Sequence, residues 1–453
     1  MNYLELLKSQ TQNLKLDCEY WDVRIESVIE TTIDLVDGEI VTCSASPSSG
    51  AFIRVRKDGF WFYESTTKLN RINESLHQLA SQQSKTNFLY KYVPGKQTKF
   101  SKILYGTTNF SLVSLNKKLN LVKLYSEVMK REPFLISYQT SYNDTYKVKA
   151  FVNSVGTEFV YDFNQAGIAL RYTLKKEEAI FDDKISFYAS DFSELEGKEE
   201  VIRSNLLESK EFLDAPSVKP GKYKVLFDPE LTGVFTHESF GHKSEADFML
   251  GDLKALEDWK LGSMIAVSGL TIVDCGIHEK TSGYCPIDDD GVLAKKNYLI
   301  KNGVLSSRLH SIDTAIQLNE KPTGNSRSMS FEFEPIVRMT STYIEAGNES
   351  LDNILKKSEG AILVKGAKHG SGLSTFTIAP NRGYLIEKNG KKKPIRVSVV
   401  SGSVFETLKN IELISSDVEL HSSAIGGCGK MKQWPLPVSA GGPYILVKDM
   451  QVS

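Results

Sequence analysis

In the first 220 residues, the spacing between apolar residues changes several times between the period of a helix and the period of a strand. Four segments carry them at helical spacing, and we predict helices over 3–16, 68–84, 112–131 and 194–213. Four others alternate apolar and polar residues, which predicts strands near 134–141, 146–153, 157–162 and 166–174. Asp37-Gly38 and Asp58-Gly59 signal two-residue hairpin turns in an alternating region that begins at Trp21. Residues 87–110 show no clear period, so we expect a connecting segment there.

A stretch rich in proline, glycine and serine at 215–221 is the best candidate for a domain boundary. Beyond it, residues 222–227 predict a buried strand, and Asn302-Gly303 and Asn389-Gly390 signal hairpins. Short helices are expected at 311–318, 350–358 and 403–410. The predicted fold class is α+β, with a mixed α/β N-terminal domain over 1–220 and a mostly antiparallel β C-terminal domain over 221–453.

Composition narrows the class of protein. With 41% apolar and 25% charged residues, the chain resembles an ordinary globular protein, and 453 residues are enough for two domains. A formal net charge of −1 gives no electrostatic reason to expect a nucleic-acid or membrane partner. No apolar run is long enough to span a bilayer, and the first residues lack the pattern of a signal peptide. Because the five cysteines form no disulfide framework, we expect a cytoplasmic protein.

The segment His237-Glu238-Ser239-Phe240-Gly241-His242 holds two of the seven histidines, with a glutamate beside the first. Imidazoles bind zinc, and in zinc hydrolases a glutamate that does not bind the metal takes a proton from the attacking water. The spacing is HExxxH, however, and residues five apart on an ideal α-helix lie about 140° apart around its axis. Both histidines reach one metal only if the helix contains a π-bulge or ends near Gly241. We expect this helix in the C-terminal domain.

A catalytic zinc site takes three protein ligands, so a third ligand is needed. Glu245 and Asp247 are local candidates, and Cys428 is a distant one between Gly426-Gly427 and Gly429. Such neighbours offer Cys428 no apolar packing, but they permit the close approach that a ligand loop needs. The chemistry of the residues therefore favours Cys428 over Glu245.

Other polar groups have alternative interpretations. Asp288-Asp289-Asp290-Gly291 lacks the spacing of a calcium loop, and we interpret it as a turn or a site-shaping acidic loop. Cys275 and Cys285 fit no metal-binding pattern and are expected in the core or in turns. His369 is expected in a loop, with Gly370-Ser371-Gly372 near a substrate. The sequence does not identify the donor that stabilises an oxyanion, for which the candidates are His421, Arg338 and Arg327.

Five segments in the same order resemble the TldD/PmbA family, the HExxxH metallopeptidases once described as modulators of DNA gyrase. They are 233–242 with Glu245-Ala246-Asp247, 286–291, 322–327, 338–343, and Gly427-Cys428-Gly429-Lys430 with Gly441-Gly442-Pro443. The resemblance implies a zinc peptidase in which His237, His242 and Cys428 bind Zn2+ and Glu238 is the general base. Because the motif is intact, the chain resembles the TldD branch and not the TldE (PmbA) branch. It departs from the family pattern at Phe240 and at Lys243, where a glycine is usual.

The family also implies a substrate and partners. We expect extended or unfolded peptides as substrates, in peptide maturation or degradation, bound by strand addition. The expected assembly is a homodimer, or a heterodimer with a TldE/PmbA-like paralogue. Two other hypotheses are a non-catalytic peptide-binding partner of a related metallopeptidase and a gyrase modulator. The intact Glu238 argues against the first, because binding alone needs no general base, and the charge balance argues against direct DNA binding.

Overall fold

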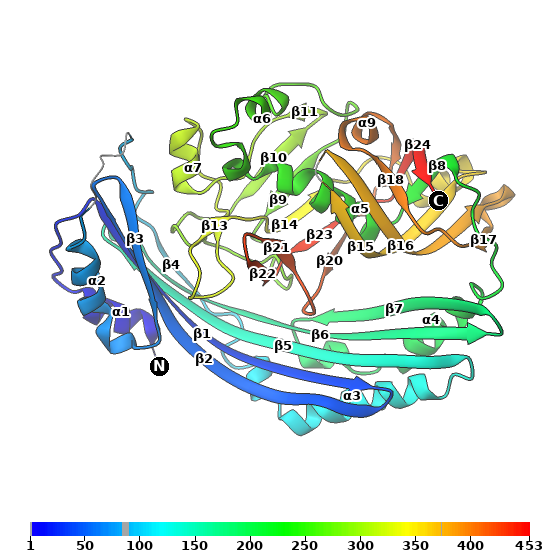
Figure 1. Ribbon diagram of the computed structural model, residues 1–453, viewed down its shortest axis with the longest axis horizontal. Coiled ribbons are helices and arrows are strands. Elements are labelled where there is room, and N and C mark those ends of the chain that lie inside the picture. The colour runs from blue at the N-terminus through cyan, green and yellow to red at the C-terminus, as the bar shows by residue number, and fades with distance from the viewer. Residues whose placement is uncertain (1, 84–89, 373) are drawn as a thin grey trace.

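A long curved sheet and a lobe packed on its concave side make up the molecule. The computed structural model describes residues 2–83, 90–372 and 374–453. Its sheets are mostly antiparallel, which confirms the predicted α+β class. In Figure 1 the curved sheet, here called the N-terminal sheet, runs along the lower part of the molecule with helices on its outer side. Residues 221–453, here called the C-terminal lobe, lie above its inner side.

The N-terminal sheet has the strand order β3-β2-β1-β5-β6-β4, and β7 also pairs with β6. Its strands are β1 (Tyr20–Val36), β2 (Glu39–Lys57), β3 (Phe60–Thr66), β4 (Lys99–Lys102), β5 (Leu135–Asn153), β6 (Glu158–Lys176) and β7 (Ala179–Ala189). Asp37-Gly38 and Asp58-Gly59 join the first three strands, as predicted. Asp37 and Asp58 have φ angles of 49° and 52°, the left-handed conformation that two-residue hairpin turns require.

Four helices accompany this sheet, within the ranges predicted for them. They are α1 (Tyr3–Thr11), α2 (Ile72–Ala80), α3 (Leu115–Lys130) and α4 (Glu199–Lys210). The amphipathic α3 begins at Ser114, whose side chain accepts a hydrogen bond from the Lys117 N–H. It buries Leu121, Val122 and Tyr125 in a core shared with the sheet.

The prediction of four separate strands between 134 and 174 is wrong. Residues 135–153 form one strand and 158–176 another, paired over almost their whole length. The polar residues at the centre of β5 suggested a break, but Asp144 is buried there and pairs with Lys118 of α3 at 2.6 Å. It also accepts a hydrogen bond from Tyr142 at 2.6 Å. These partners allow a charged residue to lie inside a continuous strand.

The segment 87–110 is more ordered than predicted. Lys99–Lys102 form β4, which pairs in parallel with the start of β6. Four residues are too short a window for alternation to be recognised in a sequence. Of the predicted connection, residues 87–89 lie outside the described part of the chain.

The C-terminal lobe contains a six-stranded sheet and a barrel. The sheet has the order β11-β10-β9-β14-β23-β20, with β9 (Ile272–Cys275), β10 (Lys296–Lys301), β11 (Val304–Leu305), β14 (Ser341–Ile344), β20 (Glu419–Ser422) and β23 (Ser439–Gly442). The barrel closes because β16 pairs with both β18 and β15 in the order β15-β8-β24-β18-β16. Its strands are β8 (Gly221–Phe227), β15 (Ile362–Gly372), β16 (Thr375–Ile386), β18 (Val400–Ser403) and β24 (Ile445–Val452).

Short elements complete the lobe. Strands β17 (Lys392–Ile395) and β19 (Ile411–Ile414) extend the barrel sheet, and β12 (Ser326–Arg327) pairs with β13 (Ile336–Val337). The helices are α5 (Pro229–Phe235), α6 (Leu253–Asp258), α7 (Ile312–Gln317), α8 (Leu351–Lys357) and α9 (Val404–Lys409). The predicted strand at 222–227, both predicted hairpins and the three predicted short helices are therefore confirmed.

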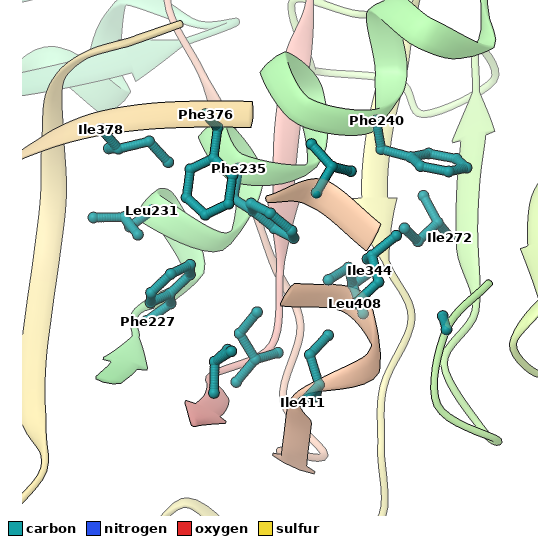
Figure 2. Close-up of a cluster of buried hydrophobic side chains, with 14 of the residues drawn as sticks. Phe227, Leu231, Phe235, Phe240, Ile272, Ile344, Phe376, Ile378, Leu408 and Ile411 are labelled. Carbon is teal, nitrogen blue, oxygen red and sulfur yellow. The ribbon is translucent and has the colours of Figure 1, made fainter. Parts of the chain in front are cut away.

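Helix α5 lies between the barrel and the six-stranded sheet, where the largest apolar core forms around it. Figure 2 shows Phe227, Leu231 and Phe235 packed beneath Phe376 and Ile378 of β16. The rings of Phe235 and Phe376 meet edge to face, with centroids 4.9 Å apart. This packing fixes the helix that leads into the HExxxH segment.

The N-terminal sheet and the C-terminal lobe are joined by buried ion pairs. Asp289 pairs with Arg24 at 3.0 Å and with Lys149 at 2.6 Å. Asp290 pairs with Arg54 at 2.9 Å. The acidic loop is therefore a structural link between the two parts, and neither residue lines the hollow described below.

Candidate metal centre

The HExxxH segment continues directly from α5. Asp228 caps this helix, because its Oδ1 accepts a hydrogen bond from the Leu231 N–H at 2.9 Å, and Pro229 fills the first position. The other carboxylate oxygen accepts from the Gly366 N–H of β15 at 3.0 Å, which ties the helix start to the barrel. Burial raises the pKa of Asp228 to about 7.

Thr236–Gly241 form a π-helical turn, one of the two geometries expected from the sequence. The His242 N–H donates to the carbonyl of His237, five residues earlier. A π-turn absorbs the additional residue of HExxxH and returns both histidines to one side. Their rings lie 5.0 Å apart, nearly perpendicular at 78°.

Gly241 is required by a close approach. A Cβ added there would lie 2.0 Å from the sulfur of buried Met339. Phe240, one of the departures from the family pattern, is fully buried with its ring centroid 4.9 Å from that of Trp259. Lys243, the other departure, places its ammonium 5.5 Å from the centre of the Trp259 ring and 5.4 Å from that of Phe405. Both departures therefore pack around the turn without entering the histidine pair.

Cys428 lies on a hairpin, not in the irregular loop that its glycines suggested. It begins β21 (Cys428–Lys430), which pairs with β22 (Gln433–Leu436). Arg338 is fully buried and holds this hairpin, because its guanidinium donates to the Cys428 carbonyl at 2.7 Å and to the Gln433 carbonyl at 3.3 Å. The Cys428 side chain is buried, at 5% exposure.

His237, His242 and Cys428 meet in space. One potential ligand atom from each lies within 4.8 Å of the others, and no further such group exists among the described residues. The Cys428 sulfur lies 3.5 Å from His242 Nε2. Nδ1 of His237 is buried with no hydrogen-bond partner in the described chain.

The cluster favours a thiolate. Burial raises the pKa of Cys428, but the two imidazoles lower it more strongly, to about 5. Burial lowers the pKa of His242, whereas Cys428 and Glu245 raise it to about 10. A metal cation bound here would displace the imidazole protons and take over their role beside the sulfur.

Glu245 and Asp247, the local candidates for a third ligand, lie outside the three-atom cluster. Glu245 Oε2 is 3.3 Å from Nδ1 of His242, the ring nitrogen that does not face Cys428. Lys430 donates to Glu245 at 3.0 Å and to Asp247 at 2.6 Å. Lys430 follows Cys428 by two residues, so these contacts fix the His242 ring and the hairpin relative to each other.

A hollow of about 840 Å³ opens in front of the cluster. His237, Glu238, His242 and Cys428 all line it, and so does His421 of β20. Glu238 is half-buried, and its Cγ lies 3.4 Å from where a Cβ of Gly370 would be. Gly370 is therefore beside Glu238, and His369 lies in β15 and not in the loop expected for it.

Two of the three candidates for an oxyanion donor have other partners. Arg338 holds the Cys428 hairpin, and Arg327 donates to the carbonyls of Met339 and Pro437. Neither lines the hollow, whereas His421 does. Cys275 and Cys285 are buried core residues, as predicted.

The sequence did not reveal Arg338 and Lys430 as residues that position the site. Arg338 contacts a carbonyl 90 residues away, and Lys430 a carboxylate 185 residues away. The sequence offered one indication of their importance: both residues lie in segments that carry the family resemblance.

Sequence comparisons find family models and relatives that match this chain. The sequence model of the PmbA/TldA metallopeptidase C-terminal domain matches residues 220–453, and that of PmbA/TldA metallopeptidase domain 1 matches 21–82. A metalloprotease of Synechocystis is 30% identical over 96% of this chain and 94% of its own length. A protein of Saccharolobus solfataricus named zinc metalloprotease TldD homolog is 28% identical over 97% of each chain.

Solved structures share the fold. TldE from Thermococcus kodakarensis has a TM-score of 0.76 at 17% identity, covering 100% of this chain and 99% of its own. A putative modulator of a DNA gyrase from Thermotoga maritima has a TM-score of 0.76 at 18% identity, with the same coverage.

Proposed function

The chain belongs to the PmbA/TldA (TldD) metallopeptidase family, and we propose that it is an active zinc-dependent peptidase that hydrolyses extended or unfolded peptides. The observation that carries the proposal is the convergence of His237, His242 and Cys428 within 4.8 Å, with Glu238 lining the same hollow. We propose the first three as metal ligands and Glu238 as the catalytic residue.

The donor set fits zinc. Two imidazole nitrogens and a thiolate suit its tetrahedral preference and leave a fourth position open, as in catalytic zinc sites. The buried, unpartnered Nδ1 of His237 and the lowered pKa of Cys428 support a bound cation. Glu245 against His242 Nδ1 supplies the carboxylate–histidine contact that orients many zinc ligands.

When bound, zinc would polarise the scissile carbonyl and make the attacking water more acidic. The Glu238 carboxylate would take the proton from that water and deliver it to the leaving amine nitrogen. Glu245 and Lys430 hold His242 in place during these transfers, since their contacts fix its ring and the Cys428 hairpin. His421 remains our candidate for a donor to the developing oxyanion, because it lines the hollow.

Two strand edges support an extended peptide as the substrate. β7 pairs with β6 on one side and with no other described strand, and β20 is the last strand of its sheet. Residues of both strands line the hollow, including Lys184 and Tyr188 of β7 and His421 of β20. An extended chain pairing with either edge would be recognised mainly through its backbone.

Partners and location follow from the same proposal. The TldE fold neighbour supports pairing with a TldE/PmbA-like paralogue, and a homodimer is the other assembly we propose. No helix in the described chain is long and apolar enough to cross a bilayer. We propose a cytoplasmic protein with a domain boundary at 220/221 and a role in peptide maturation or degradation.

The test is a substitution of the proposed base. In purified protein containing zinc, Glu238→Gln should lower cleavage of an unfolded protein by at least about 100-fold. Zinc content measured by mass spectrometry should stay at the parent level, because Glu238 is not a ligand. Equal cleavage by the variant and the parent contradicts the mechanism. A parent protein that binds peptide and zinc but cleaves nothing would favour the non-catalytic partner.

A further inference from the structure

A second hollow lies behind the hairpin that carries Cys428. Its volume is about 470 Å³, within the range of ligand-binding pockets. It lies between the two parts of the molecule, because Tyr161 and Phe163 of the N-terminal sheet line it together with Tyr284 and Leu436 of the C-terminal lobe. In Figure 1, β20 and β21 are drawn directly above the N-terminal sheet.

The two hollows are separated by the segment 423–427, here called the connector, which joins β20 to β21. Ser423 and Gly427 line the hollow of the metal site, whereas Ala424 and Gly426 line the second hollow. Similarly, Thr281 lines the hollow of the metal site, and the next residue, Ser282, lines the second hollow. The wall between them is therefore about one residue thick.

The connector is held weakly. Ser282 Oγ donates to the Ser423 carbonyl at 3.0 Å and to Gln165 Oε1 at 3.0 Å. No other hydrogen bond joins residues 423–427 to the remainder of the described chain, and the other bonds of Ser423 are to Ile425. A segment with so few bonds opens at low free-energy cost.

The two lysines that line the second hollow are already paired inside the protein. Lys149 is already paired with Asp289 at 2.6 Å, and Lys147 with Glu26 at 3.1 Å. The rest of the lining is mixed: polar residues, among them Glu30, Arg327 and Glu332, lie beside an aromatic and aliphatic part formed by Tyr161, Phe163, Tyr284, Pro435, Leu436 and Pro437. A charged ligand would have to compete with these internal pairs, whereas an apolar side chain would bury surface against the rings.

We propose that the second hollow binds the part of an extended polypeptide substrate that lies beyond the metal site, and that the connector moves aside when Ser282 releases Ser423. An aromatic or aliphatic side chain of the substrate then packs between Tyr161, Phe163 and Leu436. This inference rests on the proposed peptidase function, and it makes cleavage depend on substrate length.

The first experiment fills the second hollow. Thr145 of β5 lines it, and Thr145→Trp would place an indole there. The probes are two fluorogenic peptides with one cleavage sequence, one of them longer by about four residues, or about 13 Å of extended chain. The variant should lower kcat/KM for the long peptide by about tenfold and leave the short peptide unchanged.

The matched control is Gln139→Trp, six residues earlier on β5 and outside both hollows, which should leave both peptides unchanged. Equal effects of Thr145→Trp on the long and short peptides, or no effect on either, would overturn the proposal. Ser282→Ala removes the bond to the connector, and it should raise kcat/KM for the long peptide alone, by about fivefold.

A second experiment separates this proposal from the peptidase function. A long peptide carrying a photoreactive benzoyl-phenylalanine is bound to the Glu238→Gln protein and crosslinked, and the labelled residues are found by mass spectrometry. Labels on Tyr161, Phe163 or Leu436 support the second site even if the parent protein cleaves no peptide. Labels confined to residues of the metal-site hollow overturn it even if the parent is an active peptidase.

Discussion

The two ring nitrogens of His242 face different partners, and this distinguishes a ligand from a residue that orients it. Nε2 lies 3.5 Å from the Cys428 sulfur, while Nδ1 lies 3.3 Å from Glu245. Cys428→Ser should therefore lose most bound zinc on dialysis. Glu245→Gln should retain one equivalent with an affinity weaker by about 10- to 100-fold. Zinc content by mass spectrometry and competition with a chelator measure both. The reverse ranking would move the third ligand to Glu245.

At the scale of single residues, the chemical type of a side chain predicted which residues form the site, but the sequence did not predict which partner each side chain contacts. An imidazole pair beside a glutamate and a cysteine among glycines identified His237, Glu238, His242 and Cys428, which the structure places together. Arg338 was one of three candidates for the oxyanion donor, and its guanidinium instead holds the Cys428 hairpin. A guanidinium in a sequence does not show whether its partner is a substrate or a carbonyl 90 residues away.

At the scale of elements, the π-turn depends on the absence of a side chain at Gly241. A Cβ there would lie 2.0 Å from the Met339 sulfur, so Gly241→Ala should push Met339 out of the core and shift the turn. We expect a loss of about 1–3 kcal/mol in stability together with weaker zinc binding. Gly221→Ala is the control, since its Cβ would lie 3.5 Å from Tyr223, an ordinary contact. Thermal midpoints measure the stability of both variants, and zinc titration measures their affinity for zinc. If Gly241→Ala matched the parent in both, the Met339 side chain would be able to move aside without cost.

Elements whose signals are local were predictable. The hairpin turns at Asp37-Gly38 and Asp58-Gly59 and the helices around 115–130 and 312–317 follow from their own residues. The continuous strand β5 does not, because Asp144 is accommodated only by Lys118 of a separate helix. The hairpin of Cys428 was not predicted either. Its glycines indicated a ligand loop, and the strand β21 is recognised only from its pairing with β22.

At the scale of the whole molecule, Asp289 joins the N-terminal sheet to the C-terminal lobe. Burial raises the pKa of Asp289, but Arg24 and Lys149 lower it further, so that it lies below its ordinary value. A group with a depressed folded-state pKa stabilises the fold above its unfolded pKa of about 3.9, and that stability is lost as the pH falls below it. The link between the two parts should therefore weaken in acid.

Asp289→Asn tests this link. At pH 7 it removes one of the two buried carboxylates that Arg24 and Lys149 share, the other being Glu26, which should cost about 1–3 kcal/mol. Below about pH 4 the unfolded chain takes up a proton at Asp289 while the folded carboxylate keeps its charge, so the difference in thermal midpoint between parent and variant should narrow progressively as the pH falls. Asp17→Asn is the control, because the Asp17 side chain is 99% exposed, and its effect should be small at every pH. A difference in thermal midpoint between the parent and Asp289→Asn that stays constant from pH 7 to pH 3 would show that the acidic loop joins the two parts through packing. The two parts would then not be joined by charge.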